Sequence, residues 1–238
     1  MRKFLYDDGF FPRPVGMTNG FLQIQEASSS IVDGIIAKHH YSGKSTPNRF
    51  LSFLVNKDMG ALQLGYGIRP HIKHTIAKEI TADNYCEFDR MWLSDELPKN
   101  SESQVIALLL HYLKHVYPRI KFVITYADES AGNVGTIYRA TNAYEIEPVQ
   151  VDFYVLQSGE RVHPVSMWHR HGTRAKEFLE KQYPGIRHIK GEQLQRRFLY
   201  VLHNGLRRKF QERNAPIPLV RAGGGSQAPL KTIIGGET

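Results

Sequence analysis

The stretch from residue 120 to residue 144 reads IKFVITYADESAGNVGTIYRATNAY and combines a strand, a loop and a helix. β-Branched and aromatic residues at 122–126 predict a strand that ends at Asp128. A glycine-containing loop then leads into a short helix that carries Tyr138 and stops at Asn142, because asparagine tolerates the left-handed conformation of helix C-termini. An acid at the carboxyl end of a strand thus faces a phenol, and in open α/β sheets this end binds ligands. We predict a catalytic site here; the alternative is that Tyr138 only packs.

Hydrophobic periodicity predicts further elements on both sides of this stretch. Helices are expected at 28–39, 103–116 and 174–182, and strands at 50–55, 60–66, 85–93, 150–156 and 197–202. This order predicts the α/β class, with a mixed central sheet flanked by helices and a basic C-terminal extension. The chain contains neither GxGxxG nor GxxxxGK[ST], so Rossmann and P-loop interpretations lack support.

The composition divides the chain into four segments. We expect an irregular N-terminal arm at 1–27, a catalytic core at 28–157, and a basic C-terminal part of the same domain at 158–221. The glycine-rich segment 222–238 is expected to be a disordered tail.

Several classes of protein are disfavoured by composition. Among the 238 residues Cys86 is the only cysteine, which excludes a disulfide framework and a multi-cysteine metal site. No apolar run approaches the roughly 20 residues of a membrane span, and the N-terminus lacks the pattern of a signal peptide. A cytoplasmic protein with no membrane partner is therefore expected.

The net charge of +8 is unevenly distributed. Residues 161–213 hold thirteen Lys/Arg against four Glu, a local balance of +9 that leaves −1 for the rest of the chain. Such a segment suggests a polyanionic partner, for which DNA is the leading candidate. We expect DNA phosphates to be bound by Arg170, Arg174, Arg196, Arg197, Arg207 and Arg208. The alternatives are an anionic membrane surface or an ordinary solvated basic face.

Two families resemble this chain. The segment IYRATNAY (137–144) lies where GNAT-type N-acyltransferases have the end of the helix that follows their fifth strand. The phage Mu Mom family of DNA adenine-modifying proteins is more similar still. Its matching pieces are HYSG (40–43), Arg90 within FDRMWLSD, Asp128 within YADESAGNVGTIYRATN, and Tyr138, and the resemblance covers roughly residues 30–205.

The resemblance implies a GNAT-like fold and a transferase that modifies the 6-amino group of adenine in phage DNA with a carbamoylmethyl-type group. Such a modification hides the genome from host restriction endonucleases, so the place of action would be the cytoplasm of the infected bacterium. Catalytic positions carried over from the family are His40, Tyr41, Arg90, Asp128 and Tyr138. A bound iron ion is also implied, with His40, Tyr41 and Asp128 as its candidate ligands.

The chemistry of these residue types fits such roles. An aromatic amine is a poor nucleophile, so a base such as Asp128 must take its proton. Tyr138 would protonate a leaving group, as the corresponding tyrosine does in related acyltransferases. Arg90 suits a carboxylate, an oxyanion or a phosphate, unless it forms a salt bridge with Asp89, Asp95 or Asp128. The pair His40-Tyr41 is a metal pair, a wall on which a base stacks, or only the end of the first helix.

The donor side is predicted less fully. GNAT enzymes hold the pyrophosphate of acyl-CoA in a glycine-rich loop, whereas the corresponding loop here, ELPKNSES (96–103), has no glycine. The following helix N-terminus still offers amides and a positive dipole end. If acyl-CoA is the donor, Lys99, Ser101 and Ser103 are the expected contacts, although Glu96 and Glu102 oppose an anion there.

Two other functions compete with adenine modification. One is a conventional N-acetyltransferase that acts on a protein or a small amine, and the other is a non-catalytic DNA-binding protein. In the leading interpretation the protein contacts double-stranded DNA and extrudes the target adenine, because the 6-amino group is inaccessible within the duplex.

Overall fold

The structure, a computed structural model, describes residues 1–66, 76–129 and 132–213. The predicted disordered tail lies outside these residues. The chain forms two compact units, the first from residues 1–126, 135–146 and 198 onward, and the second from residues 127–134 and 147–197.

The first unit is built on a mixed sheet. Its strands are β1 (Lys3–Tyr6), β2 (Pro14–Thr18), β3 (Gln23–Glu26), β4 (Arg49–Val55), β5 (Gly60–Tyr66), β6 (Tyr85–Leu93) and the first five residues of β7 (Phe122–Asp128), side by side in this order. The C-terminal end of β10 (Arg187–Val201) and the N-terminal end of β8 (Tyr144–Val155) follow. Strands β1 to β6 are antiparallel neighbours, whereas β6 and β7 are parallel.

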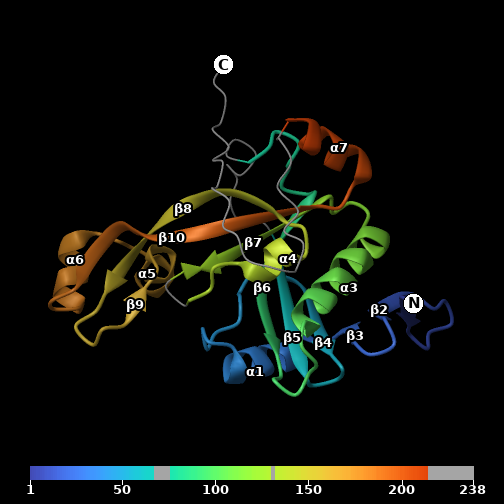
Figure 1. Ribbon diagram of the computed structural model, residues 1–238. Coiled ribbons are helices and arrows are strands. Elements are labelled where there is room, and N and C mark those ends of the chain that lie inside the picture. The colour runs from blue at the N-terminus through green and yellow to red at the C-terminus, as the bar shows by residue number, and fades with distance from the viewer. Residues whose placement is uncertain (67–75, 130–131, 214–238) are drawn as a thin grey trace. The chain divides into compact units, whose positions relative to one another are not determined.

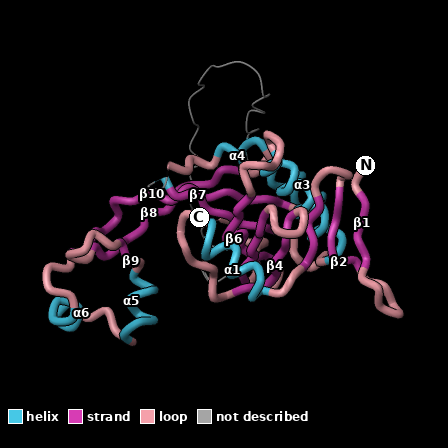
Figure 2. Tube along the Cα trace, turned by 90° about the horizontal axis from the view of Figure 1, so that it is seen from below, coloured by secondary structure: helices cyan, strands magenta, loops and turns pink. Residues whose placement is uncertain are grey.

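The helices of this unit are α1 (Ser29–His39), α3 (Ser101–Val116), α4 (Thr136–Ala140) and α7 (Asn204–Arg213). Helices α1 and α3 cover opposite faces of the sheet (Figures 1 and 2). Phe53 of β4 packs edge-on against Tyr112 of α3, while the next residue, Leu54, packs with Val32 and Ile36 of α1. Successive side chains of a strand point to opposite faces. The predicted class, a mixed sheet flanked by helices, is confirmed.

The expectation of an irregular arm at residues 1–27 is wrong in its local structure. Residues 3–26 form β1, β2 and β3, and β3 pairs with the edge of β4 through Ile24↔Val55. These strands have only four or five residues, too few to produce a clear alternating pattern. The strand β4 that pairs with β3 lies some thirty residues further along the sequence. The backbone partner supplied by β4 decides the structure.

The second unit contains the remaining parts of β8 and β10, together with β9 (Arg161–Val162), α5 (Pro164–His171) and α6 (Lys176–Gln182). Its core is formed by Tyr154, Val162, Met167 and Leu179. The unit carries nine Lys/Arg and eight Asp/Glu, a net charge of +1. The basic residues of the C-terminal part of the sequence are therefore divided between the two units, and those of α7 belong to the first unit.

Helices long and apolar enough to cross a membrane are absent from the described residues.

One partly buried carboxylate ties the N-terminal strands to α3. Glu26 accepts hydrogen bonds from the hydroxyls of Tyr112 (2.9 Å) and Tyr117 (2.6 Å), and its other oxygen bonds Arg13 (3.0 Å). Burial and this carboxylate raise the pKa of both phenols. Glu26→Gln should lower the free energy of unfolding by about 2 kcal/mol, because hydrogen bonds to a charged acceptor are lost. Urea denaturation would measure this loss, with exposed Glu96→Gln as the control; equal losses would contradict the assignment.

Candidate functional site

The hydroxyl of Tyr138 lies where β6 and β7 stop pairing. The parallel ladder runs from Tyr85↔Phe122 to Phe88↔Thr125, and the Thr125 hydroxyl donates to the Phe88 carbonyl across it (2.9 Å). The Tyr138 side chain is 7% exposed, packs against the tilted Phe198 ring with 5.1 Å between ring centroids, and is hydrogen-bonded to Thr125. The phenol is thus fixed at the end of the ladder, as the predicted strand–loop–helix unit requires.

Two left-handed residues set the course of α4. Gly135, immediately before the helix, has φ +78°, and Asn142, two residues after it, has φ +63°. The predicted left-handed stop at Asn142 is confirmed. After it the chain closes with a bond from the Ala143 amide to the Tyr138 carbonyl (3.0 Å).

Arg90 on β6 is held by main-chain carbonyls. Its Nε donates to Lys44 (3.2 Å) and its Nη1 to Asp89 (2.8 Å). Among the described residues it makes no ion pair, so the predicted alternative of a salt bridge with Asp89 or Asp95 finds no support. A guanidinium that is oriented but not neutralised can still bind an anion.

A buried polar network supports the loop that holds Arg90. Gln63 of β5 is fully buried; its amide donates to Asp33 of α1 (2.6 Å) and its carbonyl oxygen accepts from the Thr46 amide (3.4 Å). Arg49 pairs with Asp33 (2.8 Å) and bonds the Thr46 carbonyl (3.2 Å). These contacts fix residues 44–49 and therefore the Lys44 carbonyl beside Arg90.

His40 and Tyr41 follow directly after α1. Nδ1 of His40 accepts from the Ser42 amide (3.1 Å), and the His40 and Tyr41 rings lie 4.2 Å apart. Burial and then Arg90 lower the pKa of His40 to about 4, so the ring is neutral at physiological pH. Tyr41 is 67% exposed. It raises the pKa of Tyr138, whereas Arg90 lowers that pKa. The structure thus brings together four of the five predicted catalytic residues.

The fifth, Asp128, ends β7 in the second unit, where its carbonyl accepts from the Asn133 amide (3.1 Å). Its role as the base stays a prediction.

The sequence did not single out the residues that support this site. Thr125, Gln63 and Asp33 are polar residues within apolar patterns, FVITYAD, GALQLGY and SSIVDGII, and that interruption was the available signal. Trp92 stacks on His39 with 4.2 Å between ring centroids and extends the aromatic surface beside His40.

The iron implied by the resemblance does not fit the described residues. No three His, Cys, Asp or Glu side chains gather there in a way that could hold a metal ion. Nδ1 of His40 is already engaged by Ser42. No catalytic step is assigned to a metal.

The predicted cofactor contacts lie around the start of α3. A cavity of about 320 Å³ is lined by the loop that contains Lys99 and Ser101. The Ser101 hydroxyl donates to the Pro98 carbonyl (2.6 Å) and that of Ser103 to the Asn100 carbonyl (2.9 Å). Both hydroxyls thus stabilise the loop itself, which leaves Lys99 and the helix amides as donors for an anion.

The six predicted DNA-binding arginines fall into two groups. Three are engaged within the second unit: Arg170 pairs with Glu160 (3.1 Å), Arg196 with Glu129, and Arg197 is buried with its Nε on the Glu147 carbonyl (2.6 Å). Arg174, in the second unit, and Arg207 and Arg208, on α7, are exposed and form no ion pair within the described chain.

Asp89, which lies beside Arg90, is expected to make the stability of the fold depend on pH. Burial raises the pKa of Asp89 to about 6, although Arg90 opposes the rise. Because this pKa is above that of the unfolded chain, Asp89 favours folding at low pH, and this contribution is lost as pH rises through 6. Asp89→Asn should therefore match the wild type near pH 4 and be more stable at pH 8, by on the order of 2 kcal/mol. Thermal unfolding at several pH values would test this; a difference independent of pH, or the same change in exposed Asp95→Asn, would contradict it.

Solved structures of acetyltransferases are similar to this chain over most of its length. One is the spermidine N-acetyltransferase from Vibrio cholerae in complex with CoA and spermine (10% identity, TM-score 0.44, 77% of this chain and 97% of that chain). Another is a probable GNAT-family acetyltransferase from Chromobacterium violaceum (8% identity, TM-score 0.46, 79% and 86%). Both TM-scores are below 0.5.

Comparison of sequences identifies a family. The methylcarbamoylase Mom of Escherichia phage Mu is 34% identical over 156 residues, a match that covers 64% of this chain and 64% of that relative. The model of the Mom protein family matches residues 21–219, which include Tyr138, Arg90, His40, Tyr41 and Asp128. The chain belongs to the Mom protein family.

Proposed function

We propose that this protein is a phage DNA-modifying transferase that adds a carbamoylmethyl-type group to the 6-amino group of adenine and so protects the DNA from host restriction. The observation that carries the proposal is the gathering of Tyr138, Arg90, His40 and Tyr41 at one end of the β6–β7 ladder, within the part of the chain that matches the Mom family.

The protonation states of the site support a transfer reaction. Burial raises the pKa of Tyr138, while Thr125 and Arg90 partly oppose the rise, so the phenol stays protonated and can donate a proton to a leaving group. Arg90, held by two carbonyls, would bind an oxyanion or carboxylate of the incoming group. Asp128 would take the proton of the adenine amine.

The acceptor is proposed to be adenine in double-stranded DNA, extruded from the helix. The exposed Tyr41 ring and the stacked pair of Trp92 and His39 provide aromatic surface against which an extruded base can stack. Arg174, Arg207 and Arg208 are the proposed phosphate contacts. The place of action would be the cytoplasm of the infected bacterium.

The donor is proposed to be an acyl-CoA whose phosphates lie at the start of α3. Attack of the adenine amine on this thioester would release CoA–SH and leave an N-acyl adenine, and conversion of that product to a carbamoylmethyl-type group would need a further step and a nitrogen source. Lys99 and the amides of the first helical turn would bind them, while Glu102 in the same turn weakens the site for an anion.

Mass spectrometry of nucleosides from bacteria that express the protein tests the proposal. A new adenosine adduct of the expected mass, absent from cells with the empty vector, is the expected result. Unmodified DNA together with acetylation of a small amine would instead favour a conventional acetyltransferase. Unmodified DNA with retained DNA binding would indicate a non-catalytic protein.

A further inference from the structure

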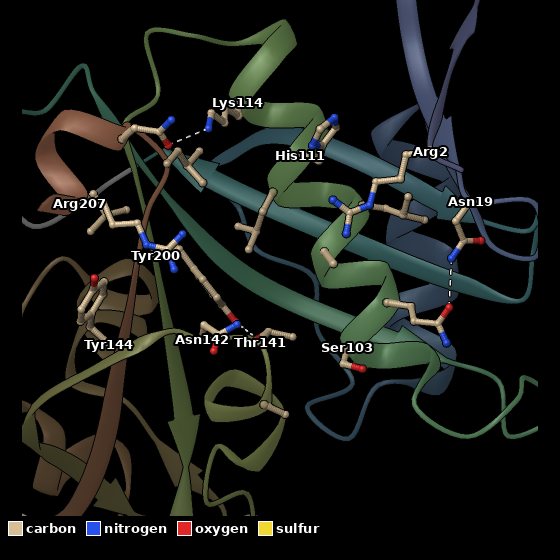
Figure 3. A pocket seen from close by; sticks show the side chains of 18 residues that line it. Arg2, Asn19, Ser103, His111, Lys114, Thr141, Asn142, Tyr144, Tyr200 and Arg207 are labelled. Atoms are coloured by element: carbon tan, nitrogen blue, oxygen red, sulfur yellow. Dashed lines mark hydrogen bonds between the residues drawn. The ribbon is translucent and has the colours of Figure 1, made fainter. Parts of the chain in front are cut away.

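A groove along the flank of α3 lies apart from the residues around the Tyr138 hydroxyl. It has a volume of about 560 Å³ and runs from Ser103 to Lys114, between α3 on one side and β10 with the end of α4 on the other (Figure 3). The rise of the helix from Ser103 to Lys114 gives the groove a length of roughly 16 Å. This volume is in the range of small-molecule sites.

The groove is positively charged. Arg2, Lys114 and Arg207 line it, and no Asp or Glu is among its described lining residues. The three cations come from the chain start, α3 and α7, so the charge is not the exposed stripe of one helix (Figure 3). Arg2 and Arg207 form no ion pair in the described chain, and Lys114 donates only to the neutral Asn204 side chain (3.0 Å).

The titration of His111 reflects this charge. His111 also lines the groove. Burial lowers its pKa, and His115, Arg2 and Lys114 lower it further. A neighbourhood that opposes one more positive charge favours an anionic group.

The floor of the groove is apolar, and aromatic rings stand among the polar groups of its walls. Leu108, Val201 and Leu202 are buried beneath it, and the Tyr144 and Tyr200 rings stand at one side (Figure 3). The Tyr200 hydroxyl is bound to Thr141, which fixes that wall. The Tyr144 ring stays partly exposed, and a planar base could cover it whereas a bare phosphate would not.

We propose that this groove is a nucleotide-binding site, with the base against the apolar floor and the phosphate bound by Arg2, Lys114 and Arg207. The nucleotide is either a free mononucleotide-type molecule or one unit of a single DNA strand, since both present the same base and phosphate. The site does not depend on the proposed transferase activity, because a nucleotide can bind without any transfer.

Calorimetric titration of the full-length protein with ADP, at constant salt, tests the charge. Arg207→Ala should raise the Kd for ADP about tenfold, because a charge-assisted hydrogen bond is lost. Lys209→Ala removes the same charge from the same helix at a position that does not line the groove, and it should change the Kd little. Equal losses in the two variants would show diffuse attraction and overturn the proposal, as would a wild type that binds neither ADP nor an oligonucleotide.

The shape is tested without changing charge. Ala107→Leu fills the groove and should weaken ADP binding about tenfold, while Ala37→Leu on the exposed face of α1 should not. Unchanged binding in Ala107→Leu, or inorganic phosphate bound as tightly as ADP, would overturn the proposal. Competition then identifies the source. A short single-stranded oligonucleotide that displaces ADP places a DNA unit in the groove, and one that binds together with ADP leaves the groove to a free nucleotide.

Discussion

Replacing Tyr138 by phenylalanine is expected to lower adenine modification by about 10²–10⁴-fold, the usual range for loss of a general acid. The substitution removes one oxygen atom and keeps the ring that packs against Phe198. Thr125 keeps its bond to the Phe88 carbonyl, so the strand ends stay in place. The effect should therefore fall on the chemical step and leave the fold intact.

The measurement is the fraction of modified adenosine in DNA, by mass spectrometry, with thermal unfolding of the same variant. Tyr6→Phe in β1, an exposed tyrosine far from this site in the fold, is the matched control and should retain full activity. Adduct levels that are unchanged in Tyr138→Phe would remove the phenol from the reaction. In that case Tyr138 would be a packing residue, as the alternative interpretation of the sequence holds.

The central stretch shows how far local sequence signals reach. Residues 120–144 predicted a strand, a loop and a short helix, and the structure has β7, α4 and the left-handed Asn142 where these were expected. Such signals work because turn residues and β-branched runs act over a few positions. The N-terminal strands carry no comparable signal, since their structure depends on pairing with the distant β4.

The same distinction applies to the site. Arg90 and Tyr138 were predicted through motifs, but the groups that orient them were not. The Lys44 carbonyl is 46 residues from Arg90 in the sequence, and Asp33 is 30 residues from Gln63. A buried glutamine in an apolar strand is expected to have a hydrogen-bond partner, but only the folded chain identifies that partner.

The distribution of charge also differs between the sequence and the folded chain. Thirteen cations within residues 161–213 predicted one basic surface. Folding instead pairs or buries Arg170, Arg196 and Arg197, and it places α7 in the first unit. Local charge counts therefore overestimate how many cations are available to a polyanion. If DNA is the partner, as we propose, Arg174, Arg207 and Arg208 are the positions where mutation should flatten the salt dependence of binding.

Gly135→Ala is expected to cost about 3 kcal/mol or more of unfolding free energy. Gly135 has φ +78°, and a Cβ built there would collide with the Phe198 ring. The left-handed conformation costs an L-residue about 1–2 kcal/mol, and forcing a methyl group into a packed core adds about 1–3 kcal/mol. Since Phe198 also supports the Tyr138 ring, adenine modification should fall as well.

Gly132→Ala is the matched control for this substitution. Gly132 lies in the same loop with φ +73°, but a Cβ there would have nothing within 4 Å, so only the conformational cost of about 1–2 kcal/mol applies. Urea denaturation of both variants separates the free-energy cost of the left-handed backbone from the cost of the contact with Phe198. Phe198→Leu in the Gly135→Ala background should recover part of the loss, because the smaller side chain makes room for the methyl group. Equal losses for the two glycines, with no recovery from Phe198→Leu, would mean that close packing of Gly135 on Phe198 does not position Tyr138.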